Sequence, residues 1–131
     1  KFSFDLDGIR IVGMIDRIDN SSNGNKVVDY KTSKRSTPAK NSVQLGIYSL
    51  YLQQTEDEKL AGIPETATLY FLRDEEQPEH NHTFTETDLD SIREKITDVA
   101  RGIRARRFEP CSGYHCDWCD YKNLACPAWE S

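Results

Sequence analysis

Long hydrophobic runs are absent from this chain of 131 residues. No apolar stretch approaches the roughly 20 residues that a membrane-spanning helix requires, so the sequence rules out an integral membrane protein. A leader of the secretory type is also missing, and the chain begins at Lys1 without an initiator methionine. We therefore expect a cytoplasmic piece of a longer protein, with one core of ordinary domain size.

The chain also lacks an excess of positive charge. Its 17 basic and 22 acidic residues give a net charge of -5 and a pI near 5.2. A protein that coats DNA nonspecifically is normally basic, so the net charge argues mildly against that class. Two segments, residues 31–40 and 101–107, are nevertheless basic and free of acids. Each is able to contact phosphate groups locally or to serve as an ordinary solvated surface.

Turn residues and apolar periodicity predict the order β-β-β-α-β-β-α, followed by a compact irregular tail. The expected elements are strands at 2–6, 9–18 and 26–31, a helix at 38–54, strands at 67–73 and 82–85, and a helix at 87–104. Asp7-Gly8 is typical of a tight hairpin turn between the first two strands. Ser36 or Thr37 is expected to cap the first helix, and Thr87 the second.

Each helix is predicted to bury one apolar stripe. The expected stripes are Val43, Ile47, Leu50 and Tyr51 in the first helix, and Leu89, Ile92, Ile96, Val99 and Ile103 in the second. His80 and His82 are expected in an exposed polar loop.

Asp16 and Asp29 are the main candidates for chemistry. If segments 9–19 and 26–31 form a hairpin centred between residues 22 and 23, these two aspartates lie directly opposite each other, with Cβ atoms about 5 Å apart. Lys31 lies two residues beyond Asp29 and therefore shares its face. Opposed, half-buried carboxylates repel each other and need a shared proton, a neighbouring base or a divalent cation.

Carboxylate oxygens favour Mg²⁺, Mn²⁺ or Ca²⁺ as that cation. Such an ion orients a phosphodiester and lowers the pKa of an attacking water, so the pattern favours phosphodiester hydrolysis. In the alternative interpretation Asp16 pairs with Arg17 or Lys31, and Asp29 pairs with Lys26, as ordinary surface ion pairs.

Four segments together resemble the RecB-like nucleases of the PD-(D/E)XK superfamily. They are GMIDRID (13–19), VVDYKTSK (27–34), QLGIYSLYL (44–52) and YHCDWCDYKNLACP (114–127).

The resemblance assigns roles to five residues. It implies that Asp16 and Asp29 ligate the metal and that Lys31 supports the attacking water or the scissile phosphate. It also implies that Gln44 and Tyr48 position the DNA strand. The i,i+4 spacing of Gln44 and Tyr48 is by itself equally typical of a polar helix edge beside a core tyrosine.

The resemblance further implies an α/β, restriction-endonuclease-like fold, in which helices flank a mixed β-sheet and a Cys-rich tail follows. Residues 1–107 would form the nuclease core, and residues 108–131 a tail within the same domain. The helix that begins the family's fold and completes its metal site is expected to be lacking. An isolated fragment of this kind is expected to bind metal weakly and to cut poorly or not at all.

The implied function is Mg²⁺- or Mn²⁺-dependent cleavage of DNA in repair, recombination or foreign-DNA processing. The chain would be one domain of a larger RecB-like exonuclease or helicase-nuclease, with DNA and the helicase or other domains of the parent chain as partners. Its expected location is the cytoplasm, associated with the nucleoid.

All four cysteines lie near the end of the chain, at Cys111, Cys116, Cys119 and Cys126. Their C-x₂-C spacing in an intracellular type of chain favours metal ligation over disulfides, and four thiolates can hold zinc or an iron–sulfur cluster. RecB-like relatives often close their nuclease domain with a [4Fe-4S] cluster. Its last three cysteines match Cys116, Cys119 and Cys126, but its first lies far upstream.

Two alternatives remain open at this point. The cysteines can be four reduced thiols packed in a small tail. The whole chain can also be a non-catalytic DNA-binding or protein-interaction module, held together by a metal at its cysteines. In that case the basic segments 31–40 and 101–107 make the contacts and the aspartate pair is incidental.

Overall fold

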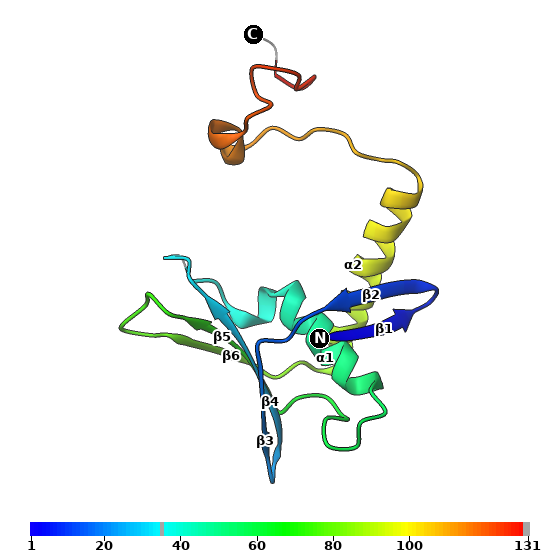
Figure 1. Ribbon diagram of the computed structural model, residues 1–131, viewed down its shortest axis with the longest axis vertical. Helices are drawn as coiled ribbons and strands as arrows, with labels where there is room; N and C mark the ends of the chain where they lie inside the picture. Colours follow the sequence, from blue (N-terminus) through cyan, green and yellow to red (C-terminus); the bar gives the residue numbers. More distant parts are fainter. Residues whose placement is uncertain (35, 130–131) are drawn as a thin grey trace. The chain divides into compact units, whose positions relative to one another are not determined.

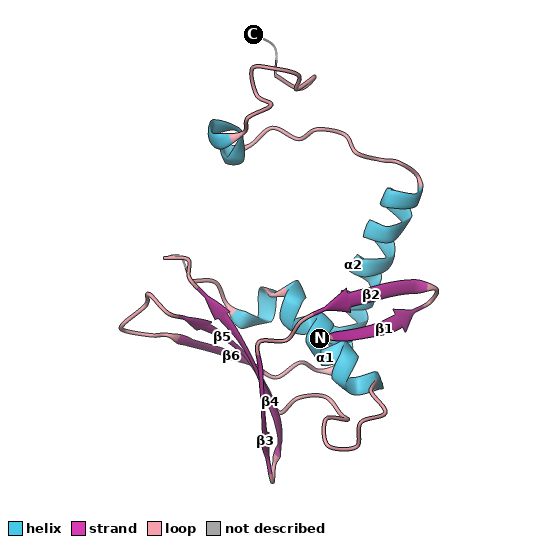
Figure 2. Ribbon diagram, viewed as in Figure 1, coloured by secondary structure: helices cyan, strands magenta, loops and turns pink. Residues whose placement is uncertain are grey.

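The computed structural model describes residues 1–34 and 36–129 (Figure 1). It divides into two compact units, residues 1–97 and 98–131, and the division falls within helix α2. The elements, coloured by type in Figure 2, are β1 (Phe2–Leu6), β2 (Ile9–Gly13), β3 (Arg17–Ser21), β4 (Gly24–Lys31), the 3₁₀ turn η1 (Ala39–Asn41), α1 (Val43–Gln54), β5 (Thr66–Phe71), β6 (Glu79–His82), α2 (Glu86–Arg104) and the 3₁₀ turn η2 (Tyr114–Trp118). None of the described helices has the length and apolar character needed to cross a membrane.

The expected mixed sheet flanked by helices is confirmed. Four strands are ordered β3-β4-β5-β6, with β4 and β5 parallel and the other two pairs antiparallel. Helix α1 forms the connection between β4 and β5, since parallel neighbours need a crossover of this kind. It packs against β4 and β5 and also against β1 (Figure 1).

The prediction of one strand at 9–18 is wrong, because β2 ends at Gly13 and a separate strand, β3, begins at Arg17. β2 pairs only with β1 in a separate two-stranded sheet, whereas β3 joins the four-stranded sheet. The strand is interrupted between these residues because polar groups of residues 14 and 16 form hydrogen bonds with other parts of the chain in place of strand pairing. The Met14 carbonyl accepts a hydrogen bond from the Tyr48 hydroxyl, and the Asp16 carboxylate accepts one from the Tyr30 backbone N–H.

The β1–β2 turn is as predicted. Asp7 and Gly8 have φ values of 50° and 76°, which are the positive values that a two-residue hairpin turn of this type requires at both central positions.

Helix α1 begins later than predicted. Its cap is Ser42, whose Oγ accepts from the Leu45 backbone N–H at 3.2 Å, in place of Ser36 or Thr37. The expected start at residue 38 belongs instead to the turn η1, which precedes the helix.

The predicted single stripe of α1 is also wrong in part. Val43 is 40% exposed, whereas Leu45, Leu50 and Leu52 are fully buried. These buried side chains do not lie on one narrow stripe, because α1 has protein on several sides. The sheet, β1 and α2 all contact it.

The contact between the two helices is closest at Gly46. A Cβ at this position would lie 2.6 Å from Cγ1 of Ile92, which is closer than real carbon atoms approach. We expect Gly46→Ala to lower the free energy of unfolding by about 1–3 kcal/mol, because overpacking outweighs the better helix propensity of alanine. Urea unfolding measures the change.

The matched control is Gly102→Ala in α2, where the nearest atom to an added Cβ is the end of the Arg107 side chain at 4.0 Å. This variant should be neutral or slightly more stable. Combining Gly46→Ala with Ile92→Ala should cost less than the sum of the two single changes, since the second relieves the clash. Strict additivity would show that the two positions do not collide.

The last strand and helix differ from prediction at their starts. β6 ends at His82, where the predicted strand began, and the half-buried His80 and His82 belong to it and not to an exposed loop.

The cap of α2 is Thr85 in place of Thr87. Thr85 Oγ1 accepts from the Asp88 N–H at 3.2 Å, while Asp88 Oδ2 accepts from the Thr85 N–H at 2.9 Å. Hydrogen bonds to the carboxylate from Thr85, first from its backbone N–H and then from its side chain, lower the pKa of the Asp88 carboxyl.

The apolar stripe of α2 is buried only in its first half. Leu89 and Ile92 are buried in the core of the first unit, and Ile96 packs against that core. Val99 and Ile103, in the second unit, are 62% and 56% exposed, so the prediction that they are core residues is wrong.

Candidate active site

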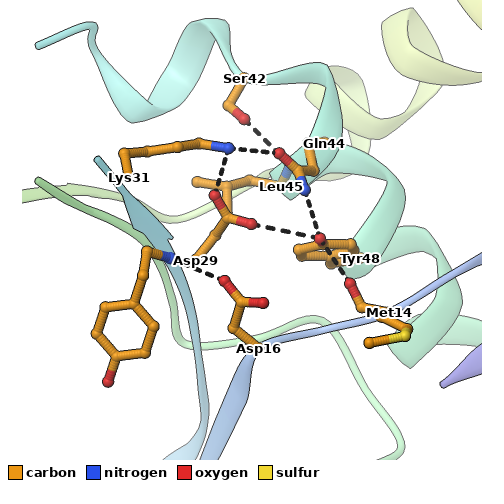
Figure 3. A network of polar contacts seen from close by, with 9 residues as sticks. Met14, Asp16, Asp29, Lys31, Ser42, Gln44, Leu45 and Tyr48 are labelled. Atoms are coloured by element: carbon orange, nitrogen blue, oxygen red, sulfur yellow. Dashed lines mark hydrogen bonds and ion pairs between the residues drawn. The ribbon is translucent and has the colours of Figure 1, made fainter. Parts of the chain in front are cut away.

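The two aspartates are brought together by the β3–β4 hairpin. Arg17 pairs with Val28 at the end of the ladder, so Asp16 lies one step further, opposite Asp29, in the register predicted from the sequence. Asp16 occupies a bend just before β3, and Asp29 lies within β4. Figure 3 shows the Asp16 carboxylate beside Asp29, whose own carboxylate extends toward Lys31 and Tyr48.

Asp29 is a buried carboxylate whose ion-pair partner among the described residues is Lys31. Its residue is 3% exposed, and its Oδ2 lies 2.5 Å from Lys31 Nζ. This contact is an ion pair without hydrogen-bond geometry, and among the described residues Oδ2 has no hydrogen-bond partner. Burial of an unpaired carboxylate is very costly, so the Lys31 ammonium compensates the charge of Asp29.

Lys31 is held in place by a second acceptor. Its Nζ donates to Gln44 Oε1 at 2.7 Å, from the first turn of α1 (Figure 3). One third of the Lys31 side chain is exposed, so its ammonium faces both the buried carboxylate and solvent.

Asp16 is the exposed member of the pair. Its Oδ2 accepts from the Tyr30 backbone N–H at 3.0 Å, which fixes the carboxylate beside β4. This leaves its other oxygen available to a ligand that also touches Asp29.

Tyr48 connects the helix to both aspartates. Its buried hydroxyl donates to the Met14 carbonyl at 2.8 Å and lies 3.4 Å from Asp29 Oδ1, and Gln44 Nε2 donates to it at 2.6 Å. Burial, followed by the negative charges of Asp29 and Asp16, raises the pKa of Tyr48 above its ordinary 10.0, although the hydrogen bond from Gln44 opposes the shift. Tyr48 is therefore a neutral hydrogen-bond donor that interacts electrostatically with both carboxylates.

Replacing Tyr48 by phenylalanine is expected to lower the free energy of unfolding by about 1–3 kcal/mol, because Met14 loses its donor. The folded-state pKa of Tyr48 is above the unfolded value of 10.0, so its contribution is complete below that pH and is lost as pH rises through the folded-state pKa. Urea unfolding from neutral to strongly alkaline pH should therefore show a steeper alkaline loss for wild type than for Tyr48→Phe. Tyr121→Phe, at a tyrosine that is 69% exposed, serves as the control. Equal alkaline slopes in wild type and Tyr48→Phe would contradict the assignment.

The surface-pair alternative does not describe these contacts. Arg17 Nε binds Asp19 at 2.7 Å, and Lys26 binds Glu79 at 3.3 Å, so neither compensates the candidate pair. Lys31 pairs with Asp29 and not with Asp16, within the part of the chain that the structure describes.

The donor set fits a divalent cation of the magnesium type. Asp16 and Asp29 offer carboxylate oxygens, which are hard ligands, and Asp29 Oδ2 is a buried oxygen without a hydrogen bond. Within residues 1–34 and 36–129, no group of three or more His, Cys, Asp or Glu side chains is arranged to hold a metal. If a cation binds here, Asp16 and Asp29 would hold it, and Mg²⁺ commonly completes a set of one or two carboxylates with water and substrate phosphate oxygens.

The four cysteines are free thiols in the second unit. Cys111 is exposed, and Cys116, Cys119 and Cys126 are half-buried. Cys116 Sγ accepts a hydrogen bond from the Gly113 N–H at 3.3 Å. In the described part of the chain these cysteines do not form a group of three or more side chains arranged to hold a metal.

The basic segments are only partly described. Arg35 lies outside the described residues, and Lys34 and Lys40 are exposed. In the second segment, Arg101 binds Asp98 at 2.9 Å.

Sequence reasoning missed two elements of the site. The first is the Met14 carbonyl, which carries no side-chain signal because any residue supplies it. The second is the Ser42 cap, which a search for a serine directly before Val43 would have found.

Comparison with known proteins adds the following. The family model for the PD-(D/E)XK nuclease superfamily matches residues 1–127. Over 134 aligned residues, which cover 98% of this chain, it is 31% identical to the Gene 69 protein of Mycobacterium phage L5 and 29% identical to the Gene 69 protein of Mycobacterium phage D29. The alignments cover 43% and 47% of those proteins, so this chain spans less than half the length of these relatives. No solved structure gives a significant match.

Proposed function

Because this chain belongs to the PD-(D/E)XK nuclease superfamily, we propose that it hydrolyses DNA phosphodiester bonds at Asp16 and Asp29 with Mg²⁺ or Mn²⁺. The observation that carries the proposal is the buried Asp29 carboxylate, which lies beside Asp16 and has the Lys31 ammonium at 2.5 Å. A structural ion pair alone does not require a second carboxylate at this point, because like charges that face each other destabilise a sheet.

Each residue of the network has a task in this chemistry. When bound, the cation acts as a Lewis acid on the scissile phosphate. Lys31 donates a hydrogen bond to a phosphate oxygen or to the attacking water from the solvent-facing side of Asp29. Gln44 holds the Lys31 ammonium in that position through its Oε1.

Tyr48 acts one step further from the substrate. It contacts Asp29 Oδ1 and ties the Met14 carbonyl to α1, which holds the short segment leading to Asp16. In this proposal Gln44 and Tyr48 are positioning residues, and of the two only the exposed Gln44 is placed to contact the DNA strand as well.

The wider setting is part of the same proposal. The motifs at 13–19, 27–34, 44–52 and 114–127 support a RecB-like type of nuclease. We propose that it is an exonuclease domain of a longer protein, acting in DNA repair, recombination or foreign-DNA processing near the nucleoid, with a helicase or other domains of its own chain as partners. We also propose that residues 108–131 belong to the same domain as the core at 1–107.

Ligation of zinc or a [4Fe-4S] cluster by Cys111, Cys116, Cys119 and Cys126 is a separate proposal that rests on their spacing. Metal analysis tests it, together with visible absorption, since iron–thiolate clusters are coloured. Absence of both zinc and iron from anaerobically purified full-length protein would refute it.

The nuclease proposal is tested with end-labelled linear DNA, single- and double-stranded, incubated with Mg²⁺, Mn²⁺ or a chelator. The expected result is shortening of the DNA only when a divalent cation is present. Both this chain and the longer protein that contains it should be assayed, since the rest of the protein can contribute ligands. DNA that stays intact with both proteins in Mn²⁺, yet is bound by them, would instead favour the non-catalytic binding module.

A further inference from the structure

A polar pocket lies between η1 and β6. It has a volume of about 380 Å³, and its walls include Lys40, Gln77, His80 and His82. The sheet register places Asp29 opposite Leu69, and Leu69 opposite His80. Residues paired in this way share one face of a sheet, so His80 lies on the Asp29 face, two strands away, at about 10 Å.

The pocket contains two groups whose polar capacity is unused. Lys40 is exposed, and within the described residues it has no ion-pair partner. His80 Nε2 is buried and, again among the described residues, lacks a hydrogen-bond partner. The His80 ring packs edge-on against Phe71 at 5.2 Å, which holds the imidazole against the sheet.

The other charged groups at the pocket are already engaged. Glu79 is ion-paired with Lys26 at 3.3 Å, and His82 Nε2 lies 3.2 Å from Asp88 Oδ2. The unused groups are therefore an ammonium and an imidazole nitrogen. An ammonium binds an anion that presents several oxygen atoms, such as a phosphate group, and an imidazole nitrogen does so when it carries a proton.

Resting on the proposed nuclease function, we propose that this pocket holds a backbone phosphate of the bound DNA strand, with Lys40 and His80 as its contacts. A separation of about 10 Å from Asp29 exceeds the rise of one nucleotide along a B-form strand, about 3.4 Å, and the winding of the strand adds to the distance between its phosphates. The pocket would thus anchor the strand one or two nucleotides from the bond that is cut. A chain with a net charge of -5 needs local anchors of this kind to hold a polyanion.

The test measures binding of a fluorescently labelled oligonucleotide by anisotropy, without divalent cations so that no cleavage occurs. Lys40→Ala should weaken binding several-fold and reduce the slope of log K against log salt by about 1, the effect of losing one phosphate contact. His80→Gln, which keeps a polar side chain, should also raise Kd. The matched control is Lys59→Ala, at an exposed lysine outside the pocket, and it should leave both Kd and slope unchanged.

The pocket assignment is overturned if Lys40→Ala binds with wild-type Kd and salt slope, or if wild-type protein does not bind the oligonucleotide. Lys40 is exposed, so its replacement does not threaten the fold. Failure of the nuclease proposal has a different signature. It leaves the binding difference between Lys40→Ala and Lys59→Ala intact while wild-type protein shows no metal-dependent cleavage.

Discussion

Asp29→Asn is expected to reduce metal-dependent DNA cleavage about 1000-fold while the domain stays folded. Lewis-acid stabilisation by a bound cation amounts to several kcal/mol, and about 4 kcal/mol corresponds to about 1000-fold in rate. The amide keeps the shape of the carboxylate but removes the charge that holds the cation. Cleavage rates at saturating Mn²⁺ and Mn²⁺ affinity by calorimetry should both fall.

Folding of the Asp29→Asn variant should be nearly unaffected. The substitution removes a buried charge, and the Lys31 ammonium that it leaves behind reaches solvent. Asp19→Asn is the matched control, because Asp19 lies on the neighbouring strand β3 and binds Arg17 away from the pair. Wild-type cleavage by Asp29→Asn, or an equal loss in Asp19→Asn, would remove Asp29 from the proposed site.

Lys31→Met should reduce the cleavage rate about 100-fold, since a hydrogen bond to a charged group is worth about 1.5–3 kcal/mol. Unlike Asp29→Asn, it should not weaken metal binding. The Lys31 ammonium lies 2.5 Å from Asp29 Oδ2 and competes with a cation for that oxygen, so Mn²⁺ affinity should rise when the ammonium is removed.

Stability gives an independent readout of the same change. Without Lys31 the buried Asp29 carboxylate loses its charged partner, and the metal-free variant should be about 1–3 kcal/mol less stable, less than for a fully buried pair because Lys31 is partly exposed. Saturating Mn²⁺ should restore this loss by binding the folded state. Lys26→Met on the opposite face of β4 is the control and should show neither effect. A parallel fall in metal affinity and rate for Lys31→Met would mean that Lys31 supports the metal site and not the substrate.

Much of the candidate site was predictable because it depends on local rules. The turn at residues 22–23 sets the register of the hairpin, and this register places Asp16 opposite Asp29. The two-residue period of a strand then puts Lys31 on the same face. The parallel pairing of β4 and β5 follows from the helix between them.

The helix ends and the burial patterns were less predictable. Ser36, Thr37 and Ser42 are all able to cap a helix, and the choice of Ser42 depends on how η1 packs against β6 and β5. Apolar periodicity assumes that a helix buries one side, whereas α1 is enclosed by the sheet, β1 and α2. His80 was misjudged because a polar sequence gave no sign that Phe71 lies under its ring.

Turn chemistry and strand alternation were therefore sufficient to bring the two aspartates and Lys31 together, since each acts over a few residues of backbone. Only the packing of α1 on the sheet decided that Gln44 holds Lys31 and that Tyr48 bonds the Met14 carbonyl beside Asp29. The same packing decided that β2 ends at Gly13, just before Met14 and Asp16. These contacts join residues 13–34 positions apart, and no local preference determines which side chains meet across such a distance.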